Sequence, residues 1–485
     1  MYGRFGLLID NAWSGAANGR TKPVHSPVSG QKVGDIAAAN LDDIDAALAA
    51  AQRGFETWRQ VPAWERAKVL RRTAELIRER VEDIAGLMST ETGKPLAEAR
   101  GETLAAADQF EWYGEEAKRI YGQTIPGRNG HERLSVIYQP VGVCVALSAW
   151  NFPALLPARK IAAALAAGCS IIARPASEAA GPCFAMGQAL MDAGLPPGAL
   201  GILTGEAALI SETLIGSPIV RKVSLTGSVP VGKRILELSA KGVKRVSMEL
   251  GGHAPVIVHA DVDPVATARK AAATKFRNCG QVCISPSRFY VHESIRSEFE
   301  SAFADFAKTL VVGDGLKDGV NMGPMIRERA LNQAFALIED ARAKGARLLT
   351  GGQRPAGLNA GWFIEPTVLT DVPDDASIMH DEPFAPVAPI AGFTDLDDVL
   401  ARANSTPFGL AAYVFTNNSE LAAVTAERLE AGMVGINETL LATAEAPFGG
   451  VKESGFGREG GALGIKDYLE AKYIRHRLSI EGARA

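Results

Sequence analysis

A chain of 485 residues, 47% hydrophobic and 22% charged, exceeds what one hydrophobic core usually organises, so two large domains are expected. The formal net charge of −4 gives no general attraction for nucleic acid or for an anionic membrane. A small-molecule substrate is favoured instead.

The five cysteines are odd in number and scattered, which is unlike a disulfide framework and predicts a reducing, cytoplasmic setting. The amino-terminal residues reach Asp10 before any apolar run long enough for a signal peptide, and no transmembrane segment is predicted. The seven histidines show no metal-ligand spacing, so no metal site is expected.

The first long pattern, from Leu41 to Gly93, is helical, and Gly93 is placed to end a helix. From Val141 onward, short apolar strands alternate with alanine-rich helical stretches. The predicted strands are Val141–Leu147, Ser170–Arg174, Leu200–Leu203, Val220–Leu225 and Arg245–Met248. This alternation predicts a parallel, doubly wound α/β sheet.

After Gly252 the alternation resumes less regularly, with strands expected near Pro255–Val258, Ser287–Val291 and Ala411–Phe415. It predicts a second α/β domain. The tail from Gly464 to Arg477 mixes basic and apolar residues, and we expect it to pack on another element or on another subunit.

One cysteine and one acid stand out as candidates for chemistry. Cys283 follows a Gly280-Gln281 turn, although a cysteine taken alone is more often a small core residue. Glu249 ends a predicted strand 34 residues earlier, where it could equally be a surface acid or a helix cap. Together, a thiol and a carboxylate suit covalent catalysis in which a nucleophile adds to a carbonyl and a base releases the product.

Two turns of the first sheet are candidate ligand sites. The segment Trp150 to Pro153 follows the first strand at its carboxyl end, where parallel sheets bind ligands, although Asn151 could simply cap a helix. The segment Leu225 to Gly232 is a strand, a turn and a helix start, whose backbone N–H groups can approach a pyrophosphate. Its Gly227-Ser228 turn lacks the GxGxxG pattern, so the signal is weak by itself.

Taken together in this order, these segments resemble the aldehyde dehydrogenase superfamily, and the resemblance covers essentially the whole chain. It extends to Glu382-Pro383-Phe384-Ala385-Pro386, Pro447-Phe448-Gly449-Gly450-Val451-Lys452, Ser454-Gly455 and Gly457-Arg458-Glu459. The resemblance implies NAD(P)-dependent oxidation of an aldehyde to a carboxylic acid through a thiohemiacetal and a thioester on Cys283.

The same resemblance implies a role for each site residue. The catalytic set is Cys283, Glu249, Asn151, Lys160 and Glu459. Within it, the Asn151 amide and the Cys283 N–H form the oxyanion site, Glu249 activates the deacylating water and Glu459 assists proton movement. The cofactor contacts are Trp150, Lys160, Arg174, Ser177, Gly227, Ser228, Gly232, Leu250, Glu382 and Phe384.

The family fold combines a Rossmann-type parallel-sheet cofactor domain, an α/β catalytic domain and a small oligomerisation arm. We expect residues 1–118 and 139–252 to form the cofactor domain and residues 253–452 the catalytic domain. Residues 119–138 and 453–485 would form the arm and the C-terminal tail. By the same resemblance we expect a homodimer or a homotetramer.

Within the superfamily, the sequence looks most like succinate-semialdehyde and α-ketoglutarate-semialdehyde dehydrogenases. Arg159 and Arg277 match positions that hold the distal carboxylate there, and Thr443 lies near a position where a hydroxyl assists. Both arginines could instead form structural ion pairs. Succinic semialdehyde is the expected substrate, with α-ketoglutarate semialdehyde or another aliphatic or aromatic aldehyde as the alternative.

The cofactor preference depends on the turn after the second predicted strand. Arg174 supplies a cation there, and Ser177 a small hydroxyl where an acidic residue in relatives binds the ribose 2′-OH. These residues favour NADP slightly over NAD, although the neighbouring Glu178 could reverse the preference.

Two other classes of function stay open at this point. A non-catalytic structural or binding member of the superfamily would not need Cys283, Glu249 and Asn151, which are all present. A thiol hydrolase would act on esters and turn over without reducing NAD(P).

Overall fold

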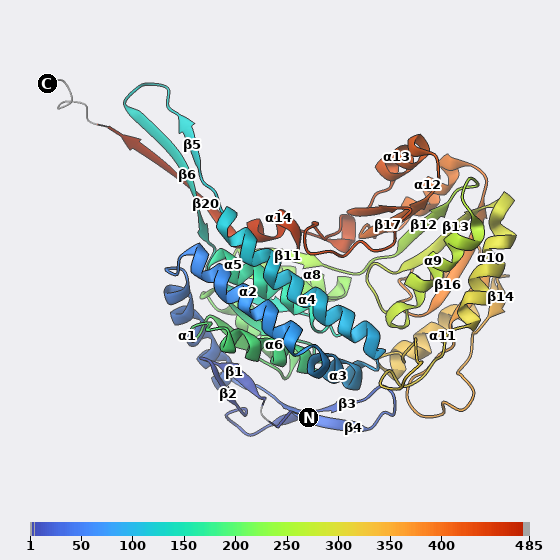
Figure 1. The fold of residues 1–485 in the computed structure, drawn as a ribbon, viewed down its shortest axis with the longest axis horizontal. Helices are drawn as coiled ribbons and strands as arrows, with labels where there is room; N and C mark the ends of the chain where they lie inside the picture. The colour runs from blue at the N-terminus through green and yellow to red at the C-terminus, as the bar shows by residue number, and fades with distance from the viewer. Residues whose placement is uncertain (1, 4, 479–485) are drawn as a thin grey trace.

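Two large sheets, each covered by helices, dominate the computed structural model, which describes residues 2–3 and 5–478 (Figure 1). The first sheet and its helices lie beside the second, and a thin three-stranded arm projects from the first (Figure 1). Within the described ranges, no helix is long and apolar enough to cross a membrane.

The first sheet has eight strands in the order β19-β11-β10-β7-β8-β9-β1-β2. Their bounds are Gly455–Phe456 (β19), Arg245–Glu249 (β11), Val220–Thr226 (β10), Val143–Leu147 (β7), Ser170–Arg174 (β8), Leu200–Ile202 (β9), Leu7–Ile9 (β1) and Ala12–Ser14 (β2). The five central strands are parallel, whereas β19, β1 and β2 pair antiparallel at the two edges. Because the strand order reverses between β7 and β10, a ligand crevice is expected outside their carboxyl ends.

Helices cover both faces of this sheet. One face packs against α2 (Ala63–Glu79), α3 (Val81–Thr92), α4 (Leu96–Glu116), α5 (Leu155–Ala167) and α6 (Gly181–Asp192), and the other against α1 (Leu41–Trp58), α7 (Ala207–Gly216) and α8 (Val229–Ala240). Alternate residues of β7 face the two cores, with Cys144 and Ala146 in the first and Val145 and Leu147 in the second. The strand β7 is therefore buried on both faces and apolar along its length, as the sequence pattern indicated.

The second sheet has seven strands in the order β14-β15-β16-β13-β12-β17-β18. Their bounds are Arg347–Thr350 (β14), Thr367–Thr370 (β15), Val387–Phe393 (β16), Pro286–His292 (β13), Ala254–Val258 (β12), Ala411–Phe415 (β17) and Met433–Ile436 (β18). All pairs are parallel except β14 with β15. The helices of this part are α9 (Pro264–Phe276), η2 (Arg277–Gly280), α10 (Glu293–Lys308), α11 (Glu328–Ala343), η3 (Ser377–Met379), α12 (Leu396–Asn404) and α13 (Ser419–Arg428).

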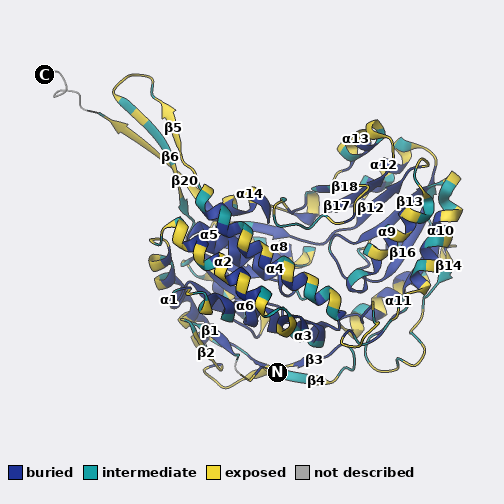
Figure 2. Ribbon diagram, in the orientation of Figure 1, coloured by how far each residue is buried: buried dark blue, intermediate teal, exposed yellow. Residues whose placement is uncertain are grey.

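The arm is an antiparallel sheet in the order β20-β6-β5, with bounds Leu469–Arg477, Glu132–Pro140 and Gln123–Pro126. It stands away from the body, and most of its residues are exposed or half-buried, in contrast to the two large sheets (Figure 2). The remaining elements are β3 (Thr21–His25), β4 (Lys32–Ala37), η1 (Ala117–Arg119), η4 (Lys452–Ser454), α14 (Gly461–Gly464) and η5 (Ile465–Tyr468).

The fold class predicted from the sequence is confirmed, and so are the strands predicted for the first sheet. The helical pattern between Leu41 and Gly93 forms three helices, and Gly93 ends the third in the left-handed conformation, with φ 73°. The predicted domain boundaries stay predictions. Of the tail expected to belong to the arm, residues 479–485 lie outside the described residues.

Candidate active site

Cys283 lies in the loop between η2 and β13, at the end of a run of unusual backbone conformations. Asn278, Cys279 and Gly280 all have positive φ values, of 50°, 56° and 69°. A Cβ atom on Gly280 would lie 2.2 Å from the carbonyl oxygen of Ala385, so only glycine fits there. The loop therefore presents Cys283 in a conformation fixed by the packing around it.

Asn151 follows β7 and is tied directly to this loop. Its Nδ2 donates to the carbonyl of Gln281 at 3.2 Å, and its own carbonyl accepts from Asn278 Nδ2 at 3.0 Å. The same carbonyl accepts from Lys94 Nζ at 2.9 Å. The first part of the chain thus positions the Asn151 amide beside the loop that carries Cys283, the predicted nucleophile.

Lys94 and Glu102 form a buried ion pair that the sequence reading did not identify. Besides binding Lys94, Glu102 accepts hydrogen bonds from the backbone N–H groups of Ala154 at 2.8 Å and Leu155 at 3.2 Å, where α5 begins. A lysine just after a helix-ending glycine is ordinarily exposed, so no local signal marked it. The pair thus fixes the turn that carries Asn151, because Lys94 binds the Asn151 carbonyl and Glu102 binds the N–H groups at the start of α5.

Glu249 ends β11, and both of its carboxylate oxygens are buried without a hydrogen-bond partner among the described residues. A Cβ atom on Gly449 would lie 2.9 Å from Oε1, so the glycine makes room for this side chain. Burial raises the pKa of Glu249 well above its ordinary value, and the charge of Glu459 raises it further. The arrangement suits a base that exchanges a proton within a water-poor site.

Glu459 and Lys160 form a second buried ion pair close to Glu249. Lys160 also donates to Thr226 Oγ1 at 2.7 Å, and Glu459 accepts from Ser224 Oγ at 3.1 Å. Oε2 of Glu459 has no partner within the described part of the chain. Lys160 and Glu459 thus lie close to Glu249, the predicted base.

A cavity of about 390 Å³ reaches Cys283 from the crevice at the carboxyl ends of β7 and β10. It is lined by Trp150, Asn151, Gly227, Ser228, Leu250, Cys283, Arg327, Glu382 and Phe384, among others. The rings of Trp150 and Phe384 meet edge to face at 5.8 Å, and Glu382 accepts from the N–H of Gly252 at 3.2 Å. The start of α8 after Ser228 offers free backbone N–H groups, so these residues fit a nicotinamide dinucleotide.

Four residues expected to contact the cofactor do not line this cavity. Lys160 lies in the buried pair with Glu459, and Gly232 packs under Leu250. Arg174 has a buried Nε without a partner among the described residues, and Ser177 Oγ donates to the Gly205 carbonyl at 3.4 Å.

Beside Ser177, Glu178 pairs at 3.7 Å with Arg327, which does line the cavity. The turn after β8 therefore lies close to the rim of the cavity.

A second, small pocket of about 30 Å³ meets Cys283 from the other side. Arg159 and Arg277 line it, and their guanidinium groups lie over the rings of Phe448 at 4.2 Å and Phe152 at 5.5 Å. Nε of Arg159 is buried without a partner, and no ion pair of this arginine occurs among the described residues. The structure thus brings both predicted substrate arginines to the nucleophile.

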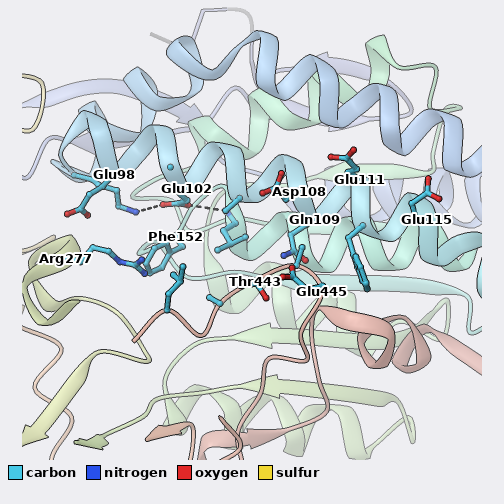
Figure 3. Close-up of a pocket in the computed structure, with 18 residues that line it drawn as sticks. Glu98, Glu102, Asp108, Gln109, Glu111, Glu115, Phe152, Arg277, Thr443 and Glu445 are labelled. Atoms are coloured by element: carbon cyan, nitrogen blue, oxygen red, sulfur yellow. Dashed lines mark hydrogen bonds and ion pairs between the residues drawn. The ribbon is translucent and has the colours of Figure 1, made fainter. Parts of the chain in front are cut away.

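An outer cavity of about 710 Å³ adjoins the small pocket, between α4 and the loop that carries Thr443 (Figure 3). The two spaces share Phe152, Leu155, Arg277 and Ala442. Thr443 lines the outer cavity and not the small pocket. Two separate spaces that share only Cys283 are thus available, one for an aldehyde and one for a cofactor.

The thiol of Cys283 is protonated in this environment. Burial raises the pKa of Cys283 to about 12, and the carboxylates of Glu382 and Glu249 contribute in the same direction. Its activation therefore requires a change in these surroundings or transfer of its proton to a base.

Comparisons with known proteins identify the family to which the chain belongs. The model of the aldehyde dehydrogenase family matches residues 13–474. The chain is 44% identical to succinate-semialdehyde dehydrogenase [NADP(+)] GabD of Escherichia coli (strain K12) and 45% identical to 3-sulfolactaldehyde dehydrogenase of Pseudomonas putida, over 96% of each chain in both cases. The crystal structure of succinate-semialdehyde dehydrogenase from Burkholderia pseudomallei matches with a TM-score of 0.96 and 42% identity, over 98% of both chains.

These similarities extend over nearly the whole length of the chain and of its relatives, and they confirm the family inferred from the sequence motifs. The fold, with its two parallel-rich sheets, agrees with them. The protein belongs to the aldehyde dehydrogenase family and is an NAD(P)-dependent aldehyde dehydrogenase.

Proposed function

We propose that the protein oxidises succinic semialdehyde to succinate and that Arg159 and Arg277 hold the carboxylate of the substrate. The observation that carries this proposal is the guanidinium of Arg159, buried beside Cys283, with its Nε unpaired among the described residues. A buried guanidinium that contacts an aromatic ring but leaves a donor unpaired is costly, and a carboxylate is the ligand that suits its planar donors. The names of two similar enzymes also specify aldehydes with an anionic group, a carboxylate in one and a sulfonate in the other.

In the proposed reaction, Glu249 takes the proton of the Cys283 thiol, and the thiolate sulfur forms a bond to the aldehyde carbon while the carbonyl oxygen gains negative charge. The Nδ2 group of Asn151 and the backbone N–H of Cys283 stabilise that oxygen. When bound, NAD(P) accepts the hydride that the aldehyde carbon loses. The product of this stage is a thioester on Cys283.

Hydrolysis then releases the acid. Glu249 takes a proton from a water molecule, the resulting hydroxide attacks the thioester, and the carbon–sulfur bond breaks. Glu459 and Lys160 are proposed to pass the proton onward, because their buried pair lies near Glu249. The raised pKa of Glu249 makes its carboxylate a stronger proton acceptor than an exposed glutamate.

We also propose that NADP is accepted and slightly preferred over NAD. The buried Nε of Arg174 has no hydrogen-bond partner among the described residues. Its guanidinium therefore offers a cation for the 2′-phosphate. Glu178 would repel that phosphate, but its pairing with Arg327 at 3.7 Å offsets its charge. Ser177 leaves space where an acidic side chain would exclude a phosphate.

For assembly, we propose a homodimer or a homotetramer in which the arm contacts another subunit. The arm sheet exposes the apolar side chains Tyr121, Ile125, Ile137, Tyr138, Tyr473 and Ile474 on and beside its strands (Figure 2). Isolated three-stranded sheets with exposed apolar groups gain stability by burying them in an interface. The domain division expected from the sequence is part of the same proposal. The domain of the first sheet would bind the cofactor, and the domain of the second sheet would carry the nucleophile.

The test is the Arg159→Leu variant, assayed on succinic semialdehyde and on uncharged butanal. Losing one charge-assisted contact should lower kcat/KM for the semialdehyde roughly 10- to 150-fold and leave butanal nearly unchanged. Arg159→Lys keeps the charge but not the planar pair of donors. Its kcat/KM for the semialdehyde should therefore lie between the values of the wild type and of Arg159→Leu. Equal losses on both aldehydes would show that Arg159 is structural and would overturn the proposed substrate.

A further inference from the structure

The side chain of Asn278 joins the two parts of the chain that meet at the candidate active site. Its Nδ2 donates one hydrogen bond to the carbonyl of Asn151 at 3.0 Å and another to the carbonyl of Gln281 at 3.1 Å. Both partners are carbonyl oxygens, which only accept, so the nitrogen of the Asn278 amide and not its oxygen must face them. Both hydrogens of this Nδ2 group are therefore used inside the protein.

The carbonyl of Gln281 is a shared acceptor, because it also accepts from Nδ2 of Asn151 at 3.2 Å. That bond uses one of the two hydrogens of the Asn151 amide and leaves the other for the oxygen of an aldehyde bound at Cys283. Asn278 thus holds both the backbone of Asn151 and the carbonyl that orients the Asn151 amide. All three residues are buried, so water does not compete for these bonds.

The backbone of Asn278 is fixed as firmly as its side chain. Its N–H donates to Oε2 of Glu98 at 2.9 Å, and its carbonyl accepts from the N–H of Gln281 at 3.0 Å and from Nε2 of the same residue at 3.2 Å. Its φ of 50° is left-handed, which asparagine tolerates better than most residues. The conformation does not require an amide, however, because Cys279 adopts the same one with φ 56°. The pair of Nδ2 donors is what Asn278 adds.

We propose that Asn278 is a positioning residue of the oxyanion site, and that its Nδ2 group sets the place of the Asn151 amide relative to Cys283. A hydrogen-bond donor stabilises the developing negative charge only from the correct position, and a displacement of about 1 Å can cost roughly 100-fold in rate. This inference deepens the proposed reaction and rests on the oxyanion role of Asn151 within it. It does not depend on which aldehyde is the substrate.

The test measures NADPH formation in the first turnover by rapid mixing, with NADP and either succinic semialdehyde or butanal at saturation. Asn278→Gly removes both donors, and glycine adopts the left-handed backbone without strain. The rate constant for hydride transfer should fall roughly 10- to 100-fold, equally on both aldehydes, because each forms the same oxyanion. Asn278→Asp keeps the shape but turns an acceptor oxygen toward the two carbonyls, so its rate should fall at least as far. This second variant decides the question if the glycine variant does not fold.

Cys279→Gly is the matched control, because it changes the next left-handed residue of the same loop. The Cys279 thiol contacts the sulfur of Met325 at 3.7 Å and makes no hydrogen bond to Asn151 within the described part of the chain. Its rate of hydride transfer should stay close to that of the wild type. Alkylation of Cys283 by iodoacetamide expels iodide without forming an oxyanion, so its rate, followed by mass spectrometry, should be kept in all three variants. If alkylation slows in parallel with hydride transfer in Asn278→Gly, the residue only holds the nucleophile loop and the proposal is wrong.

A double-variant cycle with Asn151→Ala shows whether Asn278 acts through the Asn151 amide. Asn151→Ala alone should lower the rate of hydride transfer about 100- to 1,000-fold, and adding Asn278→Gly should lower it no further. Losses that multiply in the double variant would overturn the proposal. A wild-type rate in Asn151→Ala would refute the oxyanion role in the proposed reaction, and this inference with it. A slow Asn151→Ala beside a wild-type rate in Asn278→Gly and Asn278→Asp would refute this inference alone.

Discussion

Replacing Lys94 by methionine should affect both stability and catalysis, because this one side chain neutralises a buried acid and anchors Asn151. Lys94 and Glu102 are 2% and 5% exposed, so Lys94→Met leaves the Glu102 carboxylate without a counter-charge in the interior. Breaking one half of a buried ion pair typically costs about 3–5 kcal/mol. Glu102 keeps its bonds to the N–H groups of Ala154 and Leu155, which places the expected loss near 3 kcal/mol.

The expected fall in Tm is roughly 6–12 °C for a domain of this size, measured by differential scanning calorimetry. The effect on kcat follows from the Asn151 carbonyl, which loses its 2.9 Å bond from Lys94 and keeps the 3.0 Å bond from Asn278. A looser oxyanion donor should lower kcat roughly 10- to 100-fold.

Two further variants separate these effects. Lys94→Met with Glu102→Gln removes the unpaired charge, so Tm should largely recover while kcat stays low. Arg100→Met is the control, because Arg100 and Glu82 form an exposed pair at 2.8 Å that is worth less than about 1 kcal/mol. If Lys94→Met behaves like Arg100→Met in both measurements, or if kcat recovers fully in the double variant, the positioning role of Lys94 is refuted.

Three other outcomes are expected. In a rapid-mixing experiment, Glu249→Gln should transfer one hydride to NAD(P) per active site and then stall, whereas Cys283→Ala should transfer none. Steady turnover by Cys283→Ala would contradict the covalent route. Glu459→Gln removes a negative charge that raises the pKa of Glu249, so the acidic limb of the kcat profile should move to lower pH, and a shift to higher pH would disprove the coupling. Arg174→Ala should raise the KM for NADP more than the KM for NAD, and an unchanged NADP value would remove Arg174 from the cofactor site.

Much of the first sheet could be predicted from the sequence because its strands are buried on both faces. Ser170–Arg174 was predicted with the bounds that the structure has, since an uninterrupted apolar run between two helices leaves little ambiguity. The strand β6 is different, because its side chains are mostly exposed or half-buried and, besides its neighbour β5, it pairs with β20, more than 300 residues later. No local pattern marks such a strand, and only the resemblance to a family indicated an arm.

The candidate site likewise contains residues that the sequence predicts and residues that it does not. Cys283, Glu249 and Asn151 were found because each stands in a recognisable motif at a strand end or turn. Lys94 and Glu102 were missed because their function depends on burial, and a lysine in a turn between helices and a glutamate on a helix ordinarily face water. Contacts made only in three dimensions decide which charged residues belong to the site.

The edge strand β19 has a consequence for the order in which the protein can be built. It pairs with β11 beside Glu249, and Ser454 Oγ bonds to the carbonyl of Gly251 across 203 residues of sequence. During synthesis on the ribosome, the edge of β11 that pairs with β19 therefore stays unpaired until almost the whole chain has emerged. Such long-range closure is slow and leaves an exposed edge that can pair with other nascent chains. Glu459 arrives in the same final segment, so the proposed proton-handling groups are completed only as translation ends.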